Sequence, residues 1–503
     1  MTRHKRNVPR PKPGQPQVDE ETGTTDNPPS FYVGFVVYLS FCGFAFNNIH
    51  IAQPEPYLDE VFHVPQAQKF CNGTFNQWDP KITTLPGTYL ISAATVKLVA
   101  MFGFGGSDED DGGCPTFFLR LFNFMIGFQN FQLIRGILEF YMKGENEWKI
   151  ILAAVNVSMF PVLFFFNFLF YTDVTSTFWL LLMHLLFIRK SFWSSAICGA
   201  LSILTRQTNV VWVAFHCMLM VFGKVEQLMK NESVPPTEVT DKNKKSRQRK
   251  SSHNLAGHSQ EQRGSATKKS TWEILMDLAD LGNMGGYIIT ILGFIIFVIW
   301  NGGIVVGDKE AHSVTLNFPQ IGYFTIVFGL FAAPYIVSRI TNTVSIVMNN
   351  IPWIFLGTMV ALVVVHFNTV AHPYLLSDNR HYPFYFWKNI IQTLPWGRYS
   401  LAPNYVLIWT FIFSNSPGDK FPHYSVALFI SAVVQLVPQL LLEFRYFIPV
   451  YLMARLAIPK ASWLELIIEF FIAFGINLAT LHLFVTRPFY WRDHPDELQR
   501  FMW

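Results

Sequence analysis

The segment FYVGFVVYLSFCGFAFNNIH, residues 31–50, is a continuous apolar and aromatic stretch without Asp, Glu, Lys or Arg. A helix needs about 20 such residues to cross a bilayer. The preceding residues 1–30 are basic and Pro-rich, and they lack the short apolar core and small-residue cleavage site of a signal peptide. We therefore expect 31–50 to remain as a membrane anchor behind a disordered cytosolic N-terminus.

The rest of the chain has the same character. Of its 503 residues, 51% are hydrophobic, 16% are aromatic and only 14% are charged, and the mean hydropathy is +0.27. Soluble domains usually carry about a quarter of charged residues. The composition thus excludes a purely soluble protein and predicts an all-α polytopic membrane protein. A net charge of +4 is too small to indicate a nucleic-acid partner.

Apolar runs recur along the chain and predict about twelve to thirteen transmembrane helices. They are 31–50, 117–140, 150–171, 174–188, 192–205, 208–223, 285–300, 319–338, 350–367, 401–414, 424–442, 446–458 and 463–485. Three predictions stay open. The stretch 192–223 is either two spans or one kinked hairpin, 446–458 is short for a span, and 383–398 either crosses, lies flat or extends a neighbouring helix.

Basic residues set the orientation of these helices. The N-terminal tail and residues 241–270 are rich in Lys and Arg, so the positive-inside rule places both in the cytosol. An even number of crossings must therefore separate them. The weakest apolar stretch is 86–104, which begins with Pro86 and carries Lys97. We expect it to lie along the interface, inside one long luminal loop over 51–116.

This topology predicts two hydrophobic modules. The predicted parts are an N-terminal transmembrane module (31–223), a basic disordered cytosolic linker (224–271), a C-terminal transmembrane module (272–485) and a tail (486–503). The sequence does not decide on which side of the membrane the tail lies.

The first luminal loop carries the strongest candidate chemistry. Residues 54–90 read PEPYLDEVFHVPQAQKFCNGTFNQWDPKITTLPGTYL, which is richer in polar, Pro and aromatic residues than a connector needs. If 58–70 is helical, Asp59 and His63 share one face and Glu60 lies nearby, so the carboxylates and the imidazole would converge and could remove a proton. Equally, the two carboxylates could only favour a helix N-terminus. A metal site is disfavoured, because no second ligand cluster completes it.

The same loop contains a modification motif and two cysteines. Asn72-Gly73-Thr74 is an acceptor sequon for N-glycosylation. Cys71 and Cys114 both fall in the predicted oxidising compartment and either pair or stay free, and free thiols are the favoured state.

Charged residues in or near apolar segments predict an anion site. Such residues are Arg206, Lys309, Arg380 and Arg445. An ionised side chain is costly there unless a partner or a ligand meets it. Asp173, Asp308 and Asp378 are candidate internal partners, and the remaining positive charge suits a phosphate, which arginine binds well. The motifs FYTD (170–173), TRQTN (205–209), GDKEAH (307–312) and HPYLLSDNRHY (372–382) all fall on the luminal side.

Longer strings carry a resemblance to a known family. They are EPYLDEVFHVPQAQKF, QWDPKITTLPGTYL, LFYTDVTST, LTRQTNVVWV, HPYLLSDNRHYPFYFW, LEFRYFIPVYL and QRFMW. They resemble the endoplasmic-reticulum dolichyl-phosphate-glucose α-1,2-glucosyltransferases, which add the last glucose to the lipid-linked oligosaccharide. The resemblance extends from about residue 31 to 503 and omits only the N-terminus and the basic linker.

The resemblance implies a multi-pass GT-C type glycosyltransferase of the endoplasmic-reticulum membrane, with a luminal active site and interfacial helices in its first loop. The implied donor is dolichyl-phosphate glucose and the acceptor is the diglucosylated, dolichyl-pyrophosphate-linked oligosaccharide, with no cofactor and no metal. An α-1,2 product from a β-linked donor means inversion. The family's acidic position falls on Asp59, followed by Glu60, and Asp59 is then the general base.

The other expected contacts to substrate are sugar-stacking aromatics, hydroxyl-binding polar groups and cations at the leaving phosphate. The candidates are His63, Gln66, Trp78, Asp79, Asp173, Arg206, Lys309, His312, Asp378, Arg380, His381 and Arg445. Interfacial anchoring is the commoner role for a residue such as Trp78, and polar filling of a helix face is an equally good account of Gln66.

Two other classes of protein are weighed against this one. A secondary transporter also carries buried charges and broken helices, but it predicts paired hydrophobic halves, and the two sides of the linker share no loop motifs. A non-enzymatic membrane auxiliary subunit would need none of the polar luminal motifs.

Overall fold

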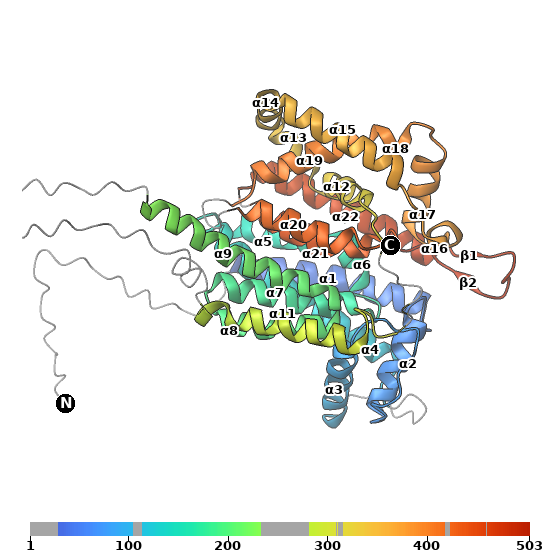
Figure 1. Ribbon diagram of the computed structural model, residues 1–503. Helices are drawn as coiled ribbons and strands as arrows, with labels where there is room; N and C mark the ends of the chain where they lie inside the picture. The colour runs from blue at the N-terminus through green and yellow to red at the C-terminus, as the bar shows by residue number, and fades with distance from the viewer. Residues whose placement is uncertain are drawn as a thin grey trace, which may run out of the picture.

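The computed structural model describes residues 29–103, 113–232, 281–307, 309, 315–417, 423–458 and 460–503. Within them, long α-helices lie side by side in one bundle (Figure 1). The all-helical membrane architecture predicted from composition is therefore confirmed, apart from one short strand pair. Most of the predicted linker, the candidate partner Asp308 and the candidate ligand His312 lie outside the described residues.

The first half of the chain forms α1 (Pro29–Ala52), α2 (Glu60–Cys71), α3 (Gly87–Met101), α4 (Thr116–Tyr141), α5 (Glu147–Ser158), α6 (Pro161–Phe166), α7 (Thr172–Ile188), α8 (Phe192–Thr205), η1 (Gln207–Asn209) and α9 (Val210–Glu232).

The second half forms α11 (Leu281–Asn301), α12 (Pro319–Phe331), α13 (Ala333–Ser338), α14 (Ile340–Asn349), α15 (Ile351–Asn368), α16 (Pro373–Ser377), α17 (Tyr382–Phe386), η2 (Trp387–Gln392), α18 (Gly397–Ser400), α19 (Ala402–Ser414), α20 (Tyr424–Leu436), η3 (Phe444–Phe447), α21 (Ile448–Leu456) and α22 (Trp463–Thr486). The strands β1 (Phe489–Tyr490) and β2 (Leu498–Gln499) pair antiparallel.

Prolines break several of the predicted spans. Pro161 separates α5 from α6, and Pro334 lies in the first turn of α13, just after α12 ends. Proline lacks the N–H for the helical hydrogen bond, and its ring clashes with the preceding turn. The predicted run 424–442 is wrong beyond Leu436, where α20 ends. Pro438 lies two residues later, and its carbonyl accepts a hydrogen bond from the Thr315 N–H rather than from a helical N–H.

The structure decides the other apolar runs whose form the sequence left open. The stretch 192–223 forms two helices, α8 and α9, separated by the short turn η1. The run 446–458 contains only the nine-residue helix α21, whose residues are almost all buried inside the bundle. Residues 383–398 form the short segments α17, η2 and α18 rather than a long helix. A buried helix does not have to match the bilayer thickness, which explains the short α21.

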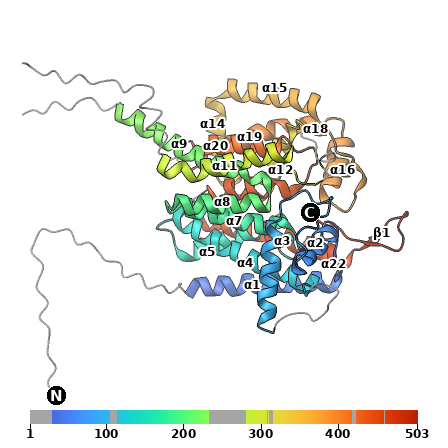
Figure 2. The same cartoon turned by 60° about the horizontal axis from the view of Figure 1, so that its bottom comes forward.

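Helix α3 lies crosswise to the bundle helices in both views (Figures 1 and 2). It packs on α2 around a small separate core that includes Phe70, Tyr89 and Val96. This arrangement agrees with the expectation that 86–104 does not cross the membrane. Five described helices are long and apolar enough to span a bilayer, and α3 is not among them.

The two cysteines of the first loop form a disulfide, Cys71–Cys114. The prediction that both stay as free thiols is therefore wrong. Cys71 is the last residue of α2, and Cys114 lies just before α4, so packing α2 against the start of α4 brings their Cα atoms to 6.4 Å. Separation along the chain gave no sign of this contact.

One end of the bundle collects most of the loops and is called the loop end below. It carries α2, α16, α17 and the β1–β2 hairpin (Figure 1). Residues beyond α22 return to this end, where the chain terminus lies near α16 in both views (Figures 1 and 2). The tail, whose side the sequence left undecided, thus lies at the same end as the first loop.

Far from the loop end, a buried ion pair joins helices of the second half. Arg455 on α21 meets Glu469 on α22 at 2.6 Å, and both side chains are almost completely inaccessible. The Glu469 carboxylate also accepts hydrogen bonds from Tyr335 (2.7 Å) and Asn156 (2.9 Å). These contacts connect α5, α13, α21 and α22. A charge in such a low-dielectric place is tolerated because it is paired and fully hydrogen-bonded.

Glu469→Ala should therefore destabilise the fold strongly. It leaves the Arg455 guanidinium buried without a counter-charge, which typically costs about 3–5 kcal/mol. Glu139→Ala is the control, because Glu139 pairs with Arg135 at 2.6 Å on a surface where its side chain is 37% exposed, and such pairs contribute only about 0.3–0.5 kcal/mol. The check is the thermal unfolding midpoint of purified protein in detergent. Equal midpoints for both variants would contradict the prediction.

Candidate active site

Asp59 lies at the start of α2 but does not cap that helix. Its side chain makes no hydrogen bond to the first turn and reaches away instead to Arg445, whose Nη1 lies 2.9 Å from Oδ2. The Asp59 side chain remains 43% exposed. The carboxylate is therefore held in position by a partner from a distant part of the chain and still faces open space, as a group that meets a substrate must.

The backbone before α2 is bent to achieve this. Leu58 has a positive φ of 54°, a conformation that costs a non-glycine residue about 1–3 kcal/mol and persists only when its surroundings fix it. Tyr57 supplies the fixing contacts. Its N–H donates to Glu60 (3.1 Å) and its hydroxyl donates to the backbone oxygen of Arg500 (2.8 Å).

Glu60 points in a different direction from Asp59. Its carboxylate meets Arg120 of α4 at 2.6 Å with both side chains inaccessible, and it accepts the Phe170 N–H at 2.6 Å. The expectation that Asp59, Glu60 and His63 converge is therefore wrong for Glu60, because neighbouring helix residues point about 100° apart. The geometry gives Glu60 an anchoring role that ties α2 to α4 and to the segment before α7.

Asp59 belongs to a chain of alternating charges at the loop end. Arg445 pairs with Asp59, with Glu443 at 2.6 Å and with Asp173 at 3.8 Å. Asp173 in turn pairs with Arg206. The prediction that Asp173 is an internal partner of these cations is confirmed, whereas Glu443 was not predicted although it lies only two residues before Arg445.

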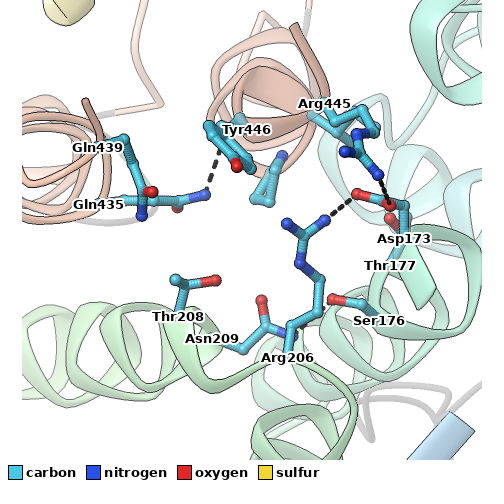
Figure 3. Close-up of a pocket in the computed structure, with 12 residues that line it drawn as sticks. Asp173, Ser176, Thr177, Arg206, Thr208, Asn209, Gln435, Gln439, Arg445 and Tyr446 are labelled. Carbon is cyan, nitrogen blue, oxygen red and sulfur yellow. Dashed lines mark hydrogen bonds and ion pairs between the residues drawn. The ribbon is translucent and has the colours of Figure 1, made fainter. Parts of the chain in front are cut away.

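A polar pocket opens beside this chain (Figure 3). It encloses about 20 Å³, and Figure 3 shows the guanidiniums of Arg206 and Arg445 both directed at Asp173. The lining residues are Asp173, Ser176, Thr177, Arg206, Thr208, Asn209, Gln435, Gln439, Arg445, Tyr446, Ile448 and Pro449. Two guanidiniums surrounded by hydroxyl and amide groups suit an oxyanion.

The break between α8 and α9 places Arg206 in this pocket. α8 ends at Thr205, and Arg206 itself is extended, with φ −148° and ψ 121°. Asn209 holds the turn by donating from Nδ2 to Ser176 Oγ (2.7 Å) and to the Ser202 carbonyl (2.9 Å). Without this interruption the Arg206 side chain would continue along the face of one helix.

Asp378, Arg380 and His381 form a second polar cluster. Arg380 binds Asp378 through two nitrogens, at 2.9 and 2.7 Å, and His381 Nε2 lies 3.7 Å from Asp378. The Arg380 guanidinium also stacks on the ring of Trp491, 4.6 Å from its centre. Asp378 is thus confirmed as an internal partner, and Arg380 is already neutralised by it.

Groups from both polar clusters affect the pKa of Asp59. Desolvation raises the pKa of Asp59, but the interactions with Arg445, His63 and His381 outweigh it, and the pKa lies below its usual value. Burial lowers the pKa of His63 despite the nearby carboxylates. Its Nδ1 lies 2.6 Å from the Tyr89 hydroxyl. Asp59 is therefore an ionised carboxylate, able to accept a proton, over a wide range of pH.

Three other predicted substrate ligands shape the first loop instead. Gln66 donates to the Gln77 carbonyl (2.8 Å) and accepts from the Asp79 N–H (2.9 Å). Asp79 accepts from the Lys81 N–H at 2.9 Å. Trp78 donates to the Ile82 carbonyl at 3.3 Å, and its ring packs beside that of Tyr89. These contacts make the loop rigid and leave no open face of Gln66, which is fully buried.

Lys309 and Asn72 lie apart from the charge chain. Lys309 donates to the Asn301 carbonyl, and no ion pair joins it to a carboxylate of the described residues. Asn72 is exposed at the end of α2, so its glycosylation stays a prediction. No group of three His, Cys, Asp or Glu residues that could hold a metal occurs in the described part of the chain.

Sequence reasoning missed two arginines that build the site. Arg120 lies in the apolar run 117–140 and pairs with Glu60, and a charge in such a run is itself a signal of a partner. Arg500 is buried near Tyr57; it lies in QRFMW, one of the strings that carry the resemblance, but no site role was predicted for it.

The chain is also similar to known proteins over most of its length. A model of the DIE2/ALG10 family matches residues 53–456. A protein of Rattus norvegicus, named Dol-P-Glc:Glc(2)Man(9)GlcNAc(2)-PP-Dol alpha-1,2-glucosyltransferase, is 34% identical over 472 residues, covering 91% of this chain and 95% of that protein. Proteins with the same name from Arabidopsis thaliana (35% identical) and Homo sapiens (34%) are similar over 90% and 91% of this chain and 95% of their own. No solved structure matches significantly.

The two neighbouring carboxylates should respond differently to neutralisation. Glu60→Gln leaves Arg120 buried without a counter-charge and should lower stability by about 3–5 kcal/mol. Asp59→Asn should change it by no more than about 1 kcal/mol, since Asp59 is half-exposed and Arg445 keeps Glu443 and Asp173. The measurement is the thermal unfolding midpoint of both variants in detergent. The reverse order would show that the roles assigned to the two residues are exchanged.

Proposed function

Because this chain belongs to the DIE2/ALG10 family, we propose that it transfers glucose from dolichyl-phosphate glucose, with inversion, in α-1,2 linkage to the diglucosylated oligosaccharide on dolichyl pyrophosphate. This is the reaction printed in the names of its relatives. The proposed setting is the endoplasmic-reticulum membrane with the loop end in the lumen.

The observation that carries the proposal is the state of Asp59. Its carboxylate is half-exposed, ionised and fixed by Arg445 at 2.9 Å. Inversion by a single displacement needs one base on the acceptor side and a stabilised leaving group on the other. Asp59 supplies the base, and the neighbouring guanidiniums supply the positive charge.

The step is one displacement at the anomeric carbon of the donor glucose. Asp59 accepts the proton of the acceptor 2-hydroxyl while that oxygen forms the new bond to the anomeric carbon. The bond from this carbon to the phosphate oxygen breaks on the opposite face, and dolichyl phosphate leaves with the electron pair. The products are the α-1,2 glucoside, dolichyl phosphate and a protonated Asp59, which returns its proton to water.

We place the departing phosphate at the polar pocket, where it would replace Asp173 as the partner of Arg206 and Arg445, because the open volume of about 20 Å³ holds only about one water molecule. Arg206 and Arg445 line it together with the hydroxyl and amide groups of Ser176, Thr208 and Asn209. Positive groups that are already in place stabilise developing negative charge most strongly where the dielectric constant is low. Arg445 touches both Asp59 and the pocket, so one residue connects the base to the leaving-group side.

An apolar groove supports a lipid-linked donor. It has a volume of about 840 Å³ and is bounded by α12, α15, α19 and α20, with Pro319 and Trp409 in its wall. Gln320, next to Pro319, donates to the Gln439 carbonyl at 3.1 Å, and Gln439 lines the polar pocket. A hydrogen bond thus connects the segment that lines the groove to a segment that lines the pocket, and we place the prenyl chain of the donor in the groove.

Asp59→Asn should abolish most of the transfer while the protein stays folded and membrane-inserted. Loss of a general base typically costs about 10²–10⁴-fold in rate. The assay is transfer of labelled glucose from dolichyl-phosphate glucose to the lipid-linked acceptor by purified protein. Glu55→Gln, at an exposed position four residues earlier, is the control and should transfer normally. Near-normal transfer by Asp59→Asn would remove Asp59 from the mechanism.

The pH dependence should report on Arg445. Its charge helps to hold the pKa of Asp59 below the usual value, so Arg445→Gln should raise that pKa. Activity that depends on ionised Asp59 is then lost at a higher pH as the solution is acidified, and the acid limb of kcat/KM moves upward. Arg445→Lys keeps the charge and should move the limb less. An unmoved limb in Arg445→Gln would contradict the assignment of Asp59 as the titrating base.

A further inference from the structure

Residues 498–503 contact segments close to Asp59, His381 and Arg445, although no site role was predicted for them. The segment follows the β1–β2 hairpin and returns to the loop end (Figure 2). Gln499, Arg500 and Met502 are buried, which is unusual for residues that follow the last helix of a bundle.

Arg500 fastens the segment to the first loop and to two long helices. Its guanidinium donates to the carbonyls of Ala52 (2.6 Å) and Phe484 (2.6 Å), which lie at the C-terminal ends of α1 and α22. A guanidinium suits such ends, because the last carbonyls of a helix lack partners and carry partial negative charge. The Arg500 N–H also donates to the Tyr57 hydroxyl at 2.7 Å, two residues before Asp59.

Met502 and Gln499 hold the second cluster. The Met502 N–H donates to the Arg380 carbonyl (2.9 Å), and the Met502 carbonyl accepts from the Tyr382 N–H (3.1 Å). These bonds enclose His381, whose Nδ1 lies 2.9 Å from the Trp503 backbone oxygen. The Gln499 amide oxygen accepts from Arg380 Nη1 at 3.1 Å.

Trp503 completes the set of contacts on the side of Arg445. Its ring lies 5.0 Å from that of Tyr382 and 6.0 Å from that of Phe444, measured between ring centres. Phe444 directly precedes Arg445 in η3. The segment therefore touches the immediate neighbours of Asp59, of His381 and of Arg445.

We propose that residues 498–503 are a positioning element for glucosyl transfer, in which Arg500, Met502 and Trp503 fix Asp59, His381 and Arg445 relative to one another. The inference rests on the proposed function, since it concerns the geometry of that reaction. None of the three touches the reacting atoms; each acts through Tyr57, through the backbone around His381 or through Phe444. A misplacement of about 1 Å in a reacting group can cost about 10²-fold in rate, so a small shift of these supports is expected to be visible in kcat.

A shift in the pKa of Asp59 is a measurable effect that distinguishes lost positioning from a general loss of stability. Asp59 faces Arg445 from η3, His63 from α2 and His381 from the loop before α17, and Asp173 of α7 lies near the same Nη1 of Arg445 as Asp59. If His381 and Arg445 move away from Asp59, the interactions that hold its pKa low become weaker, and the pKa rises. The acid limb of the pH profile should then move to higher pH.

The test uses two variants on opposite sides of the segment, Arg500→Gln and Trp503→Ala, each with a conservative partner, Arg500→Lys and Trp503→Phe. Full-length protein in lipid nanodiscs is assayed for glucose transfer across a pH series, with the folded fraction measured on the same samples. We expect kcat per folded molecule to fall at least about tenfold in both variants, with the acid limb displaced upward. The partners should recover part of the rate and most of the profile. Asp496→Asn, exposed in the hairpin, should behave as the unchanged protein.

Two results would overturn the proposal. One is a wild-type kcat and pH profile per folded molecule in both Arg500→Gln and Trp503→Ala. The other is a loss that follows the folded fraction alone while the pH profile stays unchanged, which would make the segment merely structural. Should one variant fail to fold, the other and its partner decide the question. An unchanged protein that transfers no glucose would instead overturn the proposed function, and this inference with it.

Discussion

One guanidinium holds the loop end together. Arg445 pairs with Asp59 from the first loop, with Asp173 from α7 and with Glu443 beside it. Charges at the edge of an apolar bundle are costly unless they are neutralised, so these three segments gain by meeting at one point. The same requirement keeps the carboxylate of Asp59 ionised and oriented. The position of the candidate base therefore depends on Arg445, whereas the first loop is also held by the Glu60–Arg120 pair and by Arg500.

A second ion pair separates anchoring from chemistry in neighbouring residues. Glu60 and Arg120 are both inaccessible, so their charges serve only to fix α2 against α4. Asp59 keeps 43% of its side chain exposed and remains available to a substrate. The rigid contact of Glu60 is what allows the strained turn at Leu58 to persist, because Tyr57 donates to the Glu60 carboxylate.

The fold class and all of the charge chain except Glu443 were predictable from the sequence, mainly because groups placed in or near lipid carry a cost that shapes the sequence. Apolar run lengths indicated the helices, and charges near those runs pointed to Asp173, Arg206 and Arg445. Other features depend on packing that spacing does not encode. The direction of Glu60, the Cys71–Cys114 bond and the burial of Arg500 each arise from contacts between distant segments. Arg120, Arg455 and Glu469 did carry a signal, since each is a charge within an apolar run, and the predictions overlooked it.

The junction at Arg500 also bears on biosynthesis. Its side chain joins the carbonyls at the ends of α1 and α22, so the earliest and the latest long helices of the described chain share one fastening. During translation the ribosome releases α1 long before Arg500 emerges. The first loop therefore lacks the contacts to Arg500 until α22 and the residues after it have been made. Arg500 thereby makes the final anchoring of the first loop depend on the synthesis of α22 and the residues after it.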